Sequence, residues 1–112
     1  MAGKFGLKPT VNGEYMFNLK AANGETVLTS ERYSTKAGAN TGIQSVRVNA
    51  VIDSRYEDRD SVRFEKYFVL KAANGEIIGT SEMYSSAAAR DNGKAAVKKY
   101  APEAVIDDQT IF

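Results

Sequence analysis

Two stretches of the chain alternate apolar and polar side chains on either side of an Asn-Gly pair. The pairs are Asn23-Gly24 and Asn74-Gly75. Alternation with a period of two is typical of a strand that buries one face, and Asn-Gly favours the type I′ turn of a two-residue hairpin loop. The pattern therefore predicts two β-hairpins.

A two-residue loop determines which residues of each hairpin share a face. In the first hairpin it places Lys20 opposite Val27 and Leu19 opposite Leu28. The face predicted to pack on a core carries Tyr15, Phe17, Leu19 and Leu28, with Phe68 and Leu70 in the second hairpin. The wetter face is predicted to carry Asn18, Lys20, Val27 and Thr29, with Val69, Lys71, Ile78 and Thr80 in the second hairpin.

The apolar residues change their period after each hairpin. A stripe at i, i+4, i+7 and i+11 predicts a helix with one apolar face, formed by Ala39, Ile43, Val46 and Ala50. In the second copy Lys94 stands in place of Ile43, while an alternative stripe consists of Ala89, Gly93, Val97 and Tyr100. Ser34 and Ser85 are the predicted N-caps, because a hydroxyl can accept hydrogen bonds from the free amides of a first helical turn.

The two hairpin–helix segments are copies of one another. Residues 17–50 align with residues 68–101 without a gap, and 17 of these 34 positions are identical. Further strands are predicted over residues 4–8, 52–59 and 104–108.

A repeat of this size predicts how the chain is organised. One copy of about 50 residues buries too little surface to be comfortably stable alone, and no Pro-rich or Gly/Ser-rich linker separates the copies. We therefore predict one pseudo-symmetric domain over residues 1–112, with repeats over 1–54 and 55–112.

Two motifs recur in both repeats and identify a family. Leu-Lys-Ala-Ala-Asn-Gly-Glu stands at residues 19–25 and 70–76, and Thr-Ser-Glu-x-Tyr-Ser stands at residues 29–34 and 80–85. These motifs, with Gly-Ile-Gln-Ser-Val at residues 42–46, resemble the YegP-like family of small bacterial proteins of unknown function.

The resemblance implies an α+β fold. Each unit would contain three strands, a helix and a final strand, and two units would share one sheet with both helices on one face. It also implies that the C-terminal strands near Ile52 and Ile106 are exchanged between the repeats. The family has no known catalytic residues to transfer.

The composition excludes several kinds of chemistry. The chain has no His and no Cys, which excludes imidazole bases, thiolate nucleophiles, disulfides and the metal sites that these residues ligate. We predict no catalytic, cofactor-binding or metal-binding residues. With 15 Lys and Arg against 14 Asp and Glu, the net charge of +1 gives no general attraction to nucleic acid or to an anionic membrane.

Hydropathy bears on the expected location. No stretch approaches the roughly 20 apolar residues of a membrane-spanning helix, and residues 1–8 have no apolar run typical of a signal peptide. The expected location is the cytoplasm, with no membrane partner.

The wetter sheet face is the first candidate binding surface. Val27, Val69 and Ile78 would give it apolar positions open to a partner, and the equivalent Lys20 and Lys71 could contact an anion or another ligand. The alternative is that both lysines are solvated and lie with their apolar stems along the sheet.

A basic stripe on the second helix is the next candidate. Arg90, Lys94 and Lys98 recur at i, i+4 and i+8, a spacing that could follow a phosphate backbone. Bases could then stack on Tyr15, Tyr67 or Tyr100. An ordinary solvated helix face is the alternative, so nucleic acid is not the expected partner.

Two equivalent carboxylates are the last candidate. Glu31 and Glu82 could serve as an acid and a base only if both reach one substrate. Otherwise they accept hydrogen bonds at a helix start. The prediction is therefore a non-enzymatic binding module of unknown partner, a monomer whose repeats form an intramolecular pseudo-dimer. A nucleic-acid or anion binder is the second hypothesis and an enzyme the third.

Overall fold

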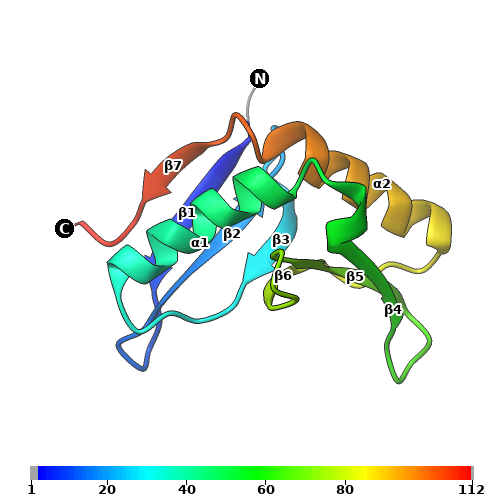
Figure 1. Cartoon of the computed structure of the whole chain (residues 1–112), viewed down its shortest axis with the longest axis horizontal. Helices are drawn as coiled ribbons and strands as arrows, with labels where there is room; N and C mark the ends of the chain where they lie inside the picture. Colours follow the sequence, from blue (N-terminus) through cyan, green and yellow to red (C-terminus); the bar gives the residue numbers. More distant parts are fainter. Residues whose placement is uncertain (1–2, 112) are drawn as a thin grey trace.

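Seven strands form one mixed sheet, on which two helices pack (Figure 1). This computed structural model describes residues 3–111; Met1, Ala2 and Phe112 lie outside the described residues, and the first two belong to the segment inspected for a signal peptide. The elements in chain order are β1 (Lys4–Pro9), β2 (Tyr15–Lys20), β3 (Thr26–Ser30), α1 (Lys36–Asn49), the 3₁₀ turn η1 (Asp53–Arg55), β4 (Tyr56–Asp60), β5 (Lys66–Lys71), β6 (Ile77–Thr80), α2 (Ala87–Tyr100) and β7 (Val105–Asp108).

The two repeats meet in the middle of the sheet. The strand order is β4-β5-β6-β3-β2-β1-β7, and all neighbours are antiparallel except β1 and β7. At the junction Thr29 of β3 lies opposite Thr80 of β6. Because these threonines hold equivalent positions in the two repeats, the pseudo-twofold axis passes between them. The predicted α+β fold with a shared sheet is confirmed.

The C-terminal strand crosses from one repeat to the other. β7 follows α2 of the second repeat but pairs in parallel with β1 of the first, with Ile106 opposite Phe5. Figure 1 shows β7, in red, along the outer edge of β1, in blue. This exchange confirms the implication of the family resemblance for the second repeat.

The segment of the first repeat that corresponds to β7 is not a strand. Residues 50–55 form a turn and η1, and β4 begins at Tyr56 rather than at the predicted Ile52. A strand formed by these residues could pair in parallel with β4 only if a connection of about a dozen residues joined the two strands. The six residues between α1 and β4 are too few, so the free edge of β4 has no counterpart of β7.

Both helices lie on one face of the sheet and cover one core. α1 contacts β2, β5 and β6, whereas α2 contacts β2, β3 and β5, so each helix spans both repeats. The predicted apolar stripe of α1 is confirmed, because its four members are fully buried. The largest buried core side chains are Phe5, Phe17, Phe68, Leu19, Leu28, Ile43 and Leu70.

Each hairpin turns through a three-residue loop, not the predicted two-residue loop. In the first hairpin the amide of Gly24 donates to the carbonyl of Ala21 (2.9 Å), and the amide of Ala21 donates to the carbonyl of Glu25 (2.9 Å). Gly24 has a φ of +86°, but Asn23 lacks the positive φ that a type I′ turn requires. Gly75 has the same φ in the second hairpin.

A β-bulge follows each loop and changes the predicted register. Lys20 lies opposite Thr26, so Val27 is an extra residue in its strand. Val27 and its equivalent Ile78 are each 7 % exposed and belong to the core. The prediction that these two residues lie on the sheet face away from the core is therefore wrong.

The helix N-caps lie one residue later than predicted. Thr35 rather than Ser34 accepts a hydrogen bond from the amide of Gly38 (2.9 Å). Ser86 rather than Ser85 accepts one from the amide of Ala89 (3.1 Å). Adjacent hydroxyl residues made either position chemically suitable.

Candidate functional site

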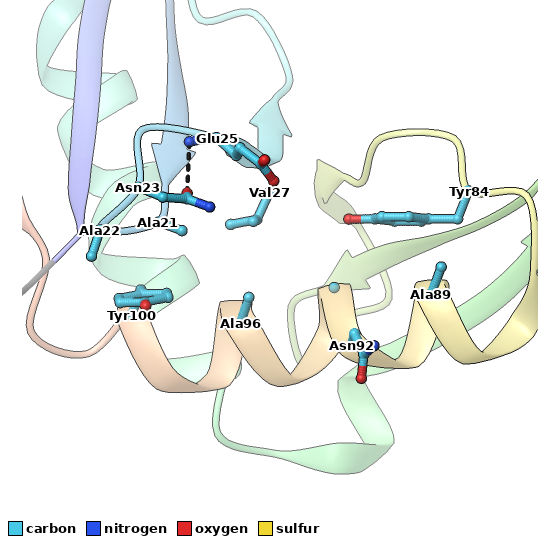
Figure 2. Close-up of a pocket in the computed structure, with 11 residues that line it drawn as sticks. Ala21, Ala22, Asn23, Glu25, Val27, Tyr84, Ala89, Asn92, Ala96 and Tyr100 are labelled. Atoms are coloured by element: carbon cyan, nitrogen blue, oxygen red, sulfur yellow. Dashed lines mark hydrogen bonds between the residues drawn. The ribbon is translucent and has the colours of Figure 1, made fainter.

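A slot lies between the two repeats and is lined by residues of both. It has a volume of about 410 Å³ and lies between α2 and the β2–β3 turn (Figure 2). We call it the α2–turn slot. Its lining residues are Ala21, Ala22, Asn23, Glu25, Val27, Tyr84, Ala89, Asn92, Gly93, Ala96 and Tyr100.

α2 supplies the floor of the slot. The lining positions 89, 92, 93, 96 and 100 recur three or four residues apart, a spacing that puts side chains on one face of a helix. Most of these side chains are small, which leaves room above the helix. Figure 2 shows Ala89 and Ala96 projecting from α2 toward the opening, with Tyr100 at one end.

Tyr84 forms one wall of the slot, and both its backbone and its ring contact neighbouring elements. Its amide and carbonyl each hydrogen bond to Lys66 at the start of β5 (2.7 Å for both). Its ring lies over α2 at Gly93, where a Cβ would collide with the Tyr84 hydroxyl. This close approach explains a glycine in the middle of a helix, where glycine costs about 1 kcal/mol relative to alanine.

The Tyr84 hydroxyl is a hydrogen-bond donor at neutral pH. Burial raises its pKa above the ordinary value of 10.0, and the carboxylates of Glu82 and Glu25 raise the pKa further. Within residues 3–111 no protein group bonds to this hydroxyl. In Figure 2 it points toward the side of the slot formed by Glu25 and Val27.

The β2–β3 turn forms the opposite wall and carries a charge. Asn23 Oδ1 accepts a hydrogen bond from the Glu25 amide (3.0 Å), and with the backbone bonds of the loop this bond fixes the turn. Glu25 is exposed at the rim and is the one charged residue in the lining. The slot therefore combines an apolar interior with a negative rim.

The equivalent place in the other repeat has a different chemistry. Tyr33 lies over Gly42 of α1 as Tyr84 lies over Gly93. Glu76 raises the pKa of Tyr33, just as Glu25 raises the pKa of Tyr84. On α1, however, Ser45 and Asn49 hold the positions that correspond to Ala96 and Tyr100.

On the α1 side, the residue that corresponds to Tyr100 is Asn49, and its side chain forms hydrogen bonds. Asn49 Nδ2 donates to the carbonyl of Ser45 (2.8 Å), and Asn49 Oδ1 accepts from Arg55 Nε (2.9 Å). The α1 side is thus polar where the α2 side carries Ala96 and Tyr100, while the tyrosine-over-glycine contact is common to both sides.

Of the eight predicted binding residues, Val27 alone lines the slot. Lys20 and Lys71, although equivalent in sequence, differ in their surroundings. Lys71 Nζ pairs with Glu57 Oε1 (2.7 Å), whereas no carboxylate among residues 3–111 lies within 4.0 Å of Lys20 Nζ. Both side chains are half-buried.

Val69 lies between β4 and β6 in the sheet and is 1 % exposed. It stands opposite Glu57 on one side and Thr80 on the other, beside the Lys71–Glu57 ion pair. These neighbours enclose it, so the prediction that Val69 is open to a partner is also wrong.

The predicted basic stripe of α2 faces acidic side chains of the same chain. Arg90 Nη2 lies 3.4 Å and Lys94 Nζ 2.8 Å from Asp58, and Lys98 pairs with Asp53. All three basic residues are therefore paired, which leaves less positive charge for a phosphate backbone.

The same ion pairs explain why Lys94 replaces an apolar residue. Lys94 and Asp58 of the second repeat correspond to Ile43 and Leu7 of the first, which are fully buried. β7 pairs with the edge of β1 that contains Leu7, whereas within residues 3–111 no strand pairs with the outer edge of β4, which contains Asp58. A charged pair is compatible with this open edge, and it disfavours pairing with other chains.

The sheet register separates the two candidate catalytic carboxylates. Thr29 lies opposite Thr80 in an antiparallel pair, so Glu31 and Glu82 follow it in opposite directions. Four residue steps of about 3.3 Å put them roughly 13 Å apart along the strands. This separation does not allow both to act on one small substrate.

The described part of the chain has neither a cluster of metal-ligating side chains nor a helix that could span a membrane. No group of three or more His, Cys, Asp or Glu side chains in residues 3–111 could hold a metal ion. Neither helix of this region is long and apolar enough to cross a membrane.

Sequence analysis did not identify the slot, because its two walls come from different repeats. The sequence did contain one signal. Ala21, Ala22 and Glu25 lie in one motif that is identical in both copies, and Tyr84 lies in another. The turn requires Asn and Gly, but no hydrogen bond in residues 3–111 accounts for the repeated Glu25 side chain.

Comparisons with known proteins agree with this repeat architecture. A family model described as "Domain of unknown function (DUF1508)" matches residues 11–57 and again residues 65–108. The "UPF0339 protein YegP" of Yersinia pestis is 49 % identical over 109 residues, which cover 97 % of each chain. A UPF0339 protein of Bordetella pertussis is 52 % identical over 110 residues, which cover 98 % of each chain.

Two solved structures are similar over nearly the whole chain. A UPF0339 protein of Shewanella oneidensis, solved by solution NMR, has a TM-score of 0.92 and 48 % identity, covering 98 % of this chain and 93 % of its own. The protein of unknown function yegP from E. coli has a TM-score of 0.93 and 45 % identity, covering 98 % and 95 %. None of these names states an activity. The chain therefore belongs to the DUF1508 family, as a member with two tandem copies of the domain and close similarity to the YegP proteins.

Proposed function

We propose that this protein is a non-enzymatic binding module, and that the α2–turn slot receives an apolar group that carries a positive charge. The observation that supports this proposal is the contrast between the lining and the rim. The interior is built from alanines, Val27 and two tyrosines, and the charge at the rim is that of Glu25.

The walls favour a cation with an apolar body. A carboxylate attracts a positive group, and the face of Tyr84 can interact with a cation through its ring quadrupole, whereas the ring of Tyr100 already has Lys99 Nζ 5.3 Å from its centroid. No basic residue lines the slot, so an anion would meet Glu25 without compensation. The protonated Tyr84 hydroxyl and the Asn92 amide provide hydrogen bonds that fix orientation.

The volume indicates a small ligand or a single side chain. Ligand pockets usually measure about 300–1,000 Å³, and the slot lies near the lower limit. It accommodates one ring or one long side chain. The absence of His and Cys from the sequence and the separation of Glu31 from Glu82 support a binding role over catalysis.

Phenethylamine is a suitable probe, because it joins one ring to an ammonium group. In an NMR titration of the ¹⁵N-labelled chain we expect shifts of the amides at residues 21–25 and 89–96. Phenylethanol should bind more weakly and phenylpropionate most weakly. Glu25→Gln should reduce the preference for the amine about 1.5- to fivefold, since an exposed ion pair contributes about 0.2–1 kcal/mol.

Matched variants distinguish the slot from general effects. Ala89→Leu should fill the slot and remove the response to the probe, whereas Ala88→Leu, on the exposed side of the same helical turn, should leave it unchanged. Glu76→Gln is the matching control for Glu25→Gln in the other repeat. Equal binding of the amine and the carboxylate, or an unchanged response in Ala89→Leu, would refute the proposal.

A further inference from the structure

The β4–β5 loop presents two large apolar side chains to solvent at a fixed tip. Val62 is 97 % and Phe64 82 % exposed. The amide of Phe64 donates to the carbonyl of Ser61 (2.9 Å), and the amides of Arg63 and Glu65 donate to Ser61 Oγ (3.2 and 3.1 Å). We call Val62, Arg63 and Phe64 the β4–β5 tip.

The backbone of this tip is unfavourable for its own sequence. Phe64 has a φ of +62° and is the only non-glycine residue with a positive φ in residues 3–111. Gly13 holds the equivalent position in the β1–β2 loop, with a φ of +78°. A bulky residue rarely adopts this left-handed conformation. Phe64 gains no core burial in return, so folding does not explain its presence.

We propose that the β4–β5 tip of one molecule docks in the α2–turn slot of a second copy of this chain. The tip has an aromatic side chain, Phe64, with the positive charge of Arg63 before it and the negative charge of Glu65 after it. Of these groups, Arg63 is the one that would meet Glu25. The slot has an apolar interior and the negative charge of Glu25. This inference rests on the proposed function, because it names the partner of the same site.

The arrangement of the chain makes the contact intermolecular. In Figure 1 the β4–β5 loop lies at the bottom of the molecule, below both helices, whereas α2 crosses the upper part. The loop therefore extends below α2 in this view, while the slot lies between α2 and the β2–β3 turn. A second copy brings an equal tip to the slot without any change of fold.

The amount of apolar surface favours a protein partner over a bilayer. Even a myristoyl chain gives only marginal, reversible membrane binding, and Val62 with Phe64 offers less apolar surface than such a chain. In a protein slot the ring of Phe64 would be enclosed on several sides, and Arg63 beside it would pair with Glu25. The contact is small, so we expect a dissociation constant on the order of ~0.1–1 mM.

Tip and slot are different surfaces, so the association is either an open head-to-tail chain or a twofold dimer in which each tip fills the slot of the other copy. Sedimentation equilibrium should therefore show a weight-average mass that increases between ~20 µM and ~1 mM protein, a range that brackets this affinity. Phe64→Gly, which copies Gly13, should remain monomeric. Ala89→Leu should also remain monomeric, while Ala88→Leu should associate like the natural chain.

Mixing the two monomeric variants gives the sharpest test. Phe64→Gly retains an intact slot and Ala89→Leu retains an intact tip, so one contact can form between them and no second one can follow. The mixture should contain a 1:1 complex and no larger species. Complex formation by this mixture also shows that both variants are folded.

The inference is overturned if the natural chain is monomeric up to ~1 mM, above the affinity expected for such a contact, or if Phe64→Gly associates equally well. It is also overturned if the chain stays monomeric but binds vesicles of phosphatidylglycerol and phosphatidylcholine in a Phe64-dependent manner. If phenethylamine still binds to the slot in these cases, only the assignment of the partner fails. If phenethylamine does not bind either, the proposed function fails as well.

Discussion

The contact between Leu28 and Gly79 predicts a strong coupling between two substitutions. These residues hold equivalent positions in the two repeats and lie near the pseudo-twofold axis. A Cβ at residue 79 would lie 2.6 Å from Leu28 Cδ2, 2.7 Å from Cγ and 3.1 Å from Cδ1. Two leucines do not fit here, so the second repeat carries glycine.

Each single substitution should destabilise the protein. Leu28 is fully buried, and Leu28→Ala should lower the free energy of unfolding by about 3–4 kcal/mol through lost burial and a residual cavity. Gly79→Ala should lower it by about 1–2 kcal/mol, because overpacking costs more than the roughly 0.5–1 kcal/mol gained on replacing a strand glycine.

The double variant should be more stable than the sum of the two effects indicates. Leu28→Ala removes the three atoms nearest to the new Cβ. In that background Gly79→Ala should raise the free energy of unfolding by about 0.5–1 kcal/mol. The resulting coupling is about 2 kcal/mol, well above the roughly 0.5 kcal/mol typical of independent sites.

Urea denaturation followed by circular dichroism on the four proteins measures this coupling, provided that the m-values agree. Gly6→Ala in β1 is the control, because a Cβ there meets only the flexible end of Gln109 at 3.3 Å. Combined with Leu28→Ala it should be additive. Additivity of Gly79→Ala with Leu28→Ala within about 0.5 kcal/mol would refute the argument that Leu28 explains the glycine.

Two further predictions concern charged side chains outside the core. Hydrogen bonds from Lys36 and Thr110 lower the pKa of Asp108 to about 2, so this contact adds stability that is present above the ordinary Asp pKa of about 3.9 and is lost as the pH falls toward 2. Lys36→Met should therefore reduce the loss of thermal midpoint between about pH 4 and pH 2, and an unchanged slope would contradict this role. Asp53→Asn combined with Asp58→Asn should release Lys98 and leave Lys94 only its longer contact with Asp91 (3.5 Å), and so increase salt-sensitive retention on heparin; retention equal to that of the natural chain would show that the ion pairs do not mask the stripe.

Much of the fold could be predicted because local pattern and internal repetition agree. The stripe of Ala39, Ile43, Val46 and Ala50 predicted the buried face of α1, and the duplicated motifs predicted two like units in one sheet. Each of these features depends on residues close together in sequence, where side-chain period decides the outcome.

The turn and the linker could not be predicted in the same way. Asn-Gly suits a two-residue loop and also a three-residue loop with glycine in the left-handed conformation, so the sequence does not choose between them. The choice decides whether Val27 points to the core or away from it. Likewise, one strand was predicted over residues 52–59, but residues 53–55 form η1 and β4 begins only at Tyr56.

The candidate site depends on contacts that no single repeat contains. Tyr84 and Ala96 of the second repeat meet Glu25 of the first only because the shared sheet places the β2–β3 turn over α2. The sequence showed that Ala89, Gly93 and Tyr100 share a face, but not that part of this face remains uncovered. Predicting the uncovered part of this face requires the position of one repeat relative to the other.

The differences between the repeats separate what folding needs from what binding uses. Folding needs the tyrosine-over-glycine contact, which both repeats keep at Tyr33 and Tyr84. The second repeat alone has Ala96 and Tyr100 where the first has Ser45 and Asn49, and Phe64 where the first has Gly13. These changes open an apolar slot and expose an aromatic tip without improving the core. Since a folded core needs neither an exposed aromatic tip nor a slot between the two repeats, the presence of both features supports the inference that slot and tip act together.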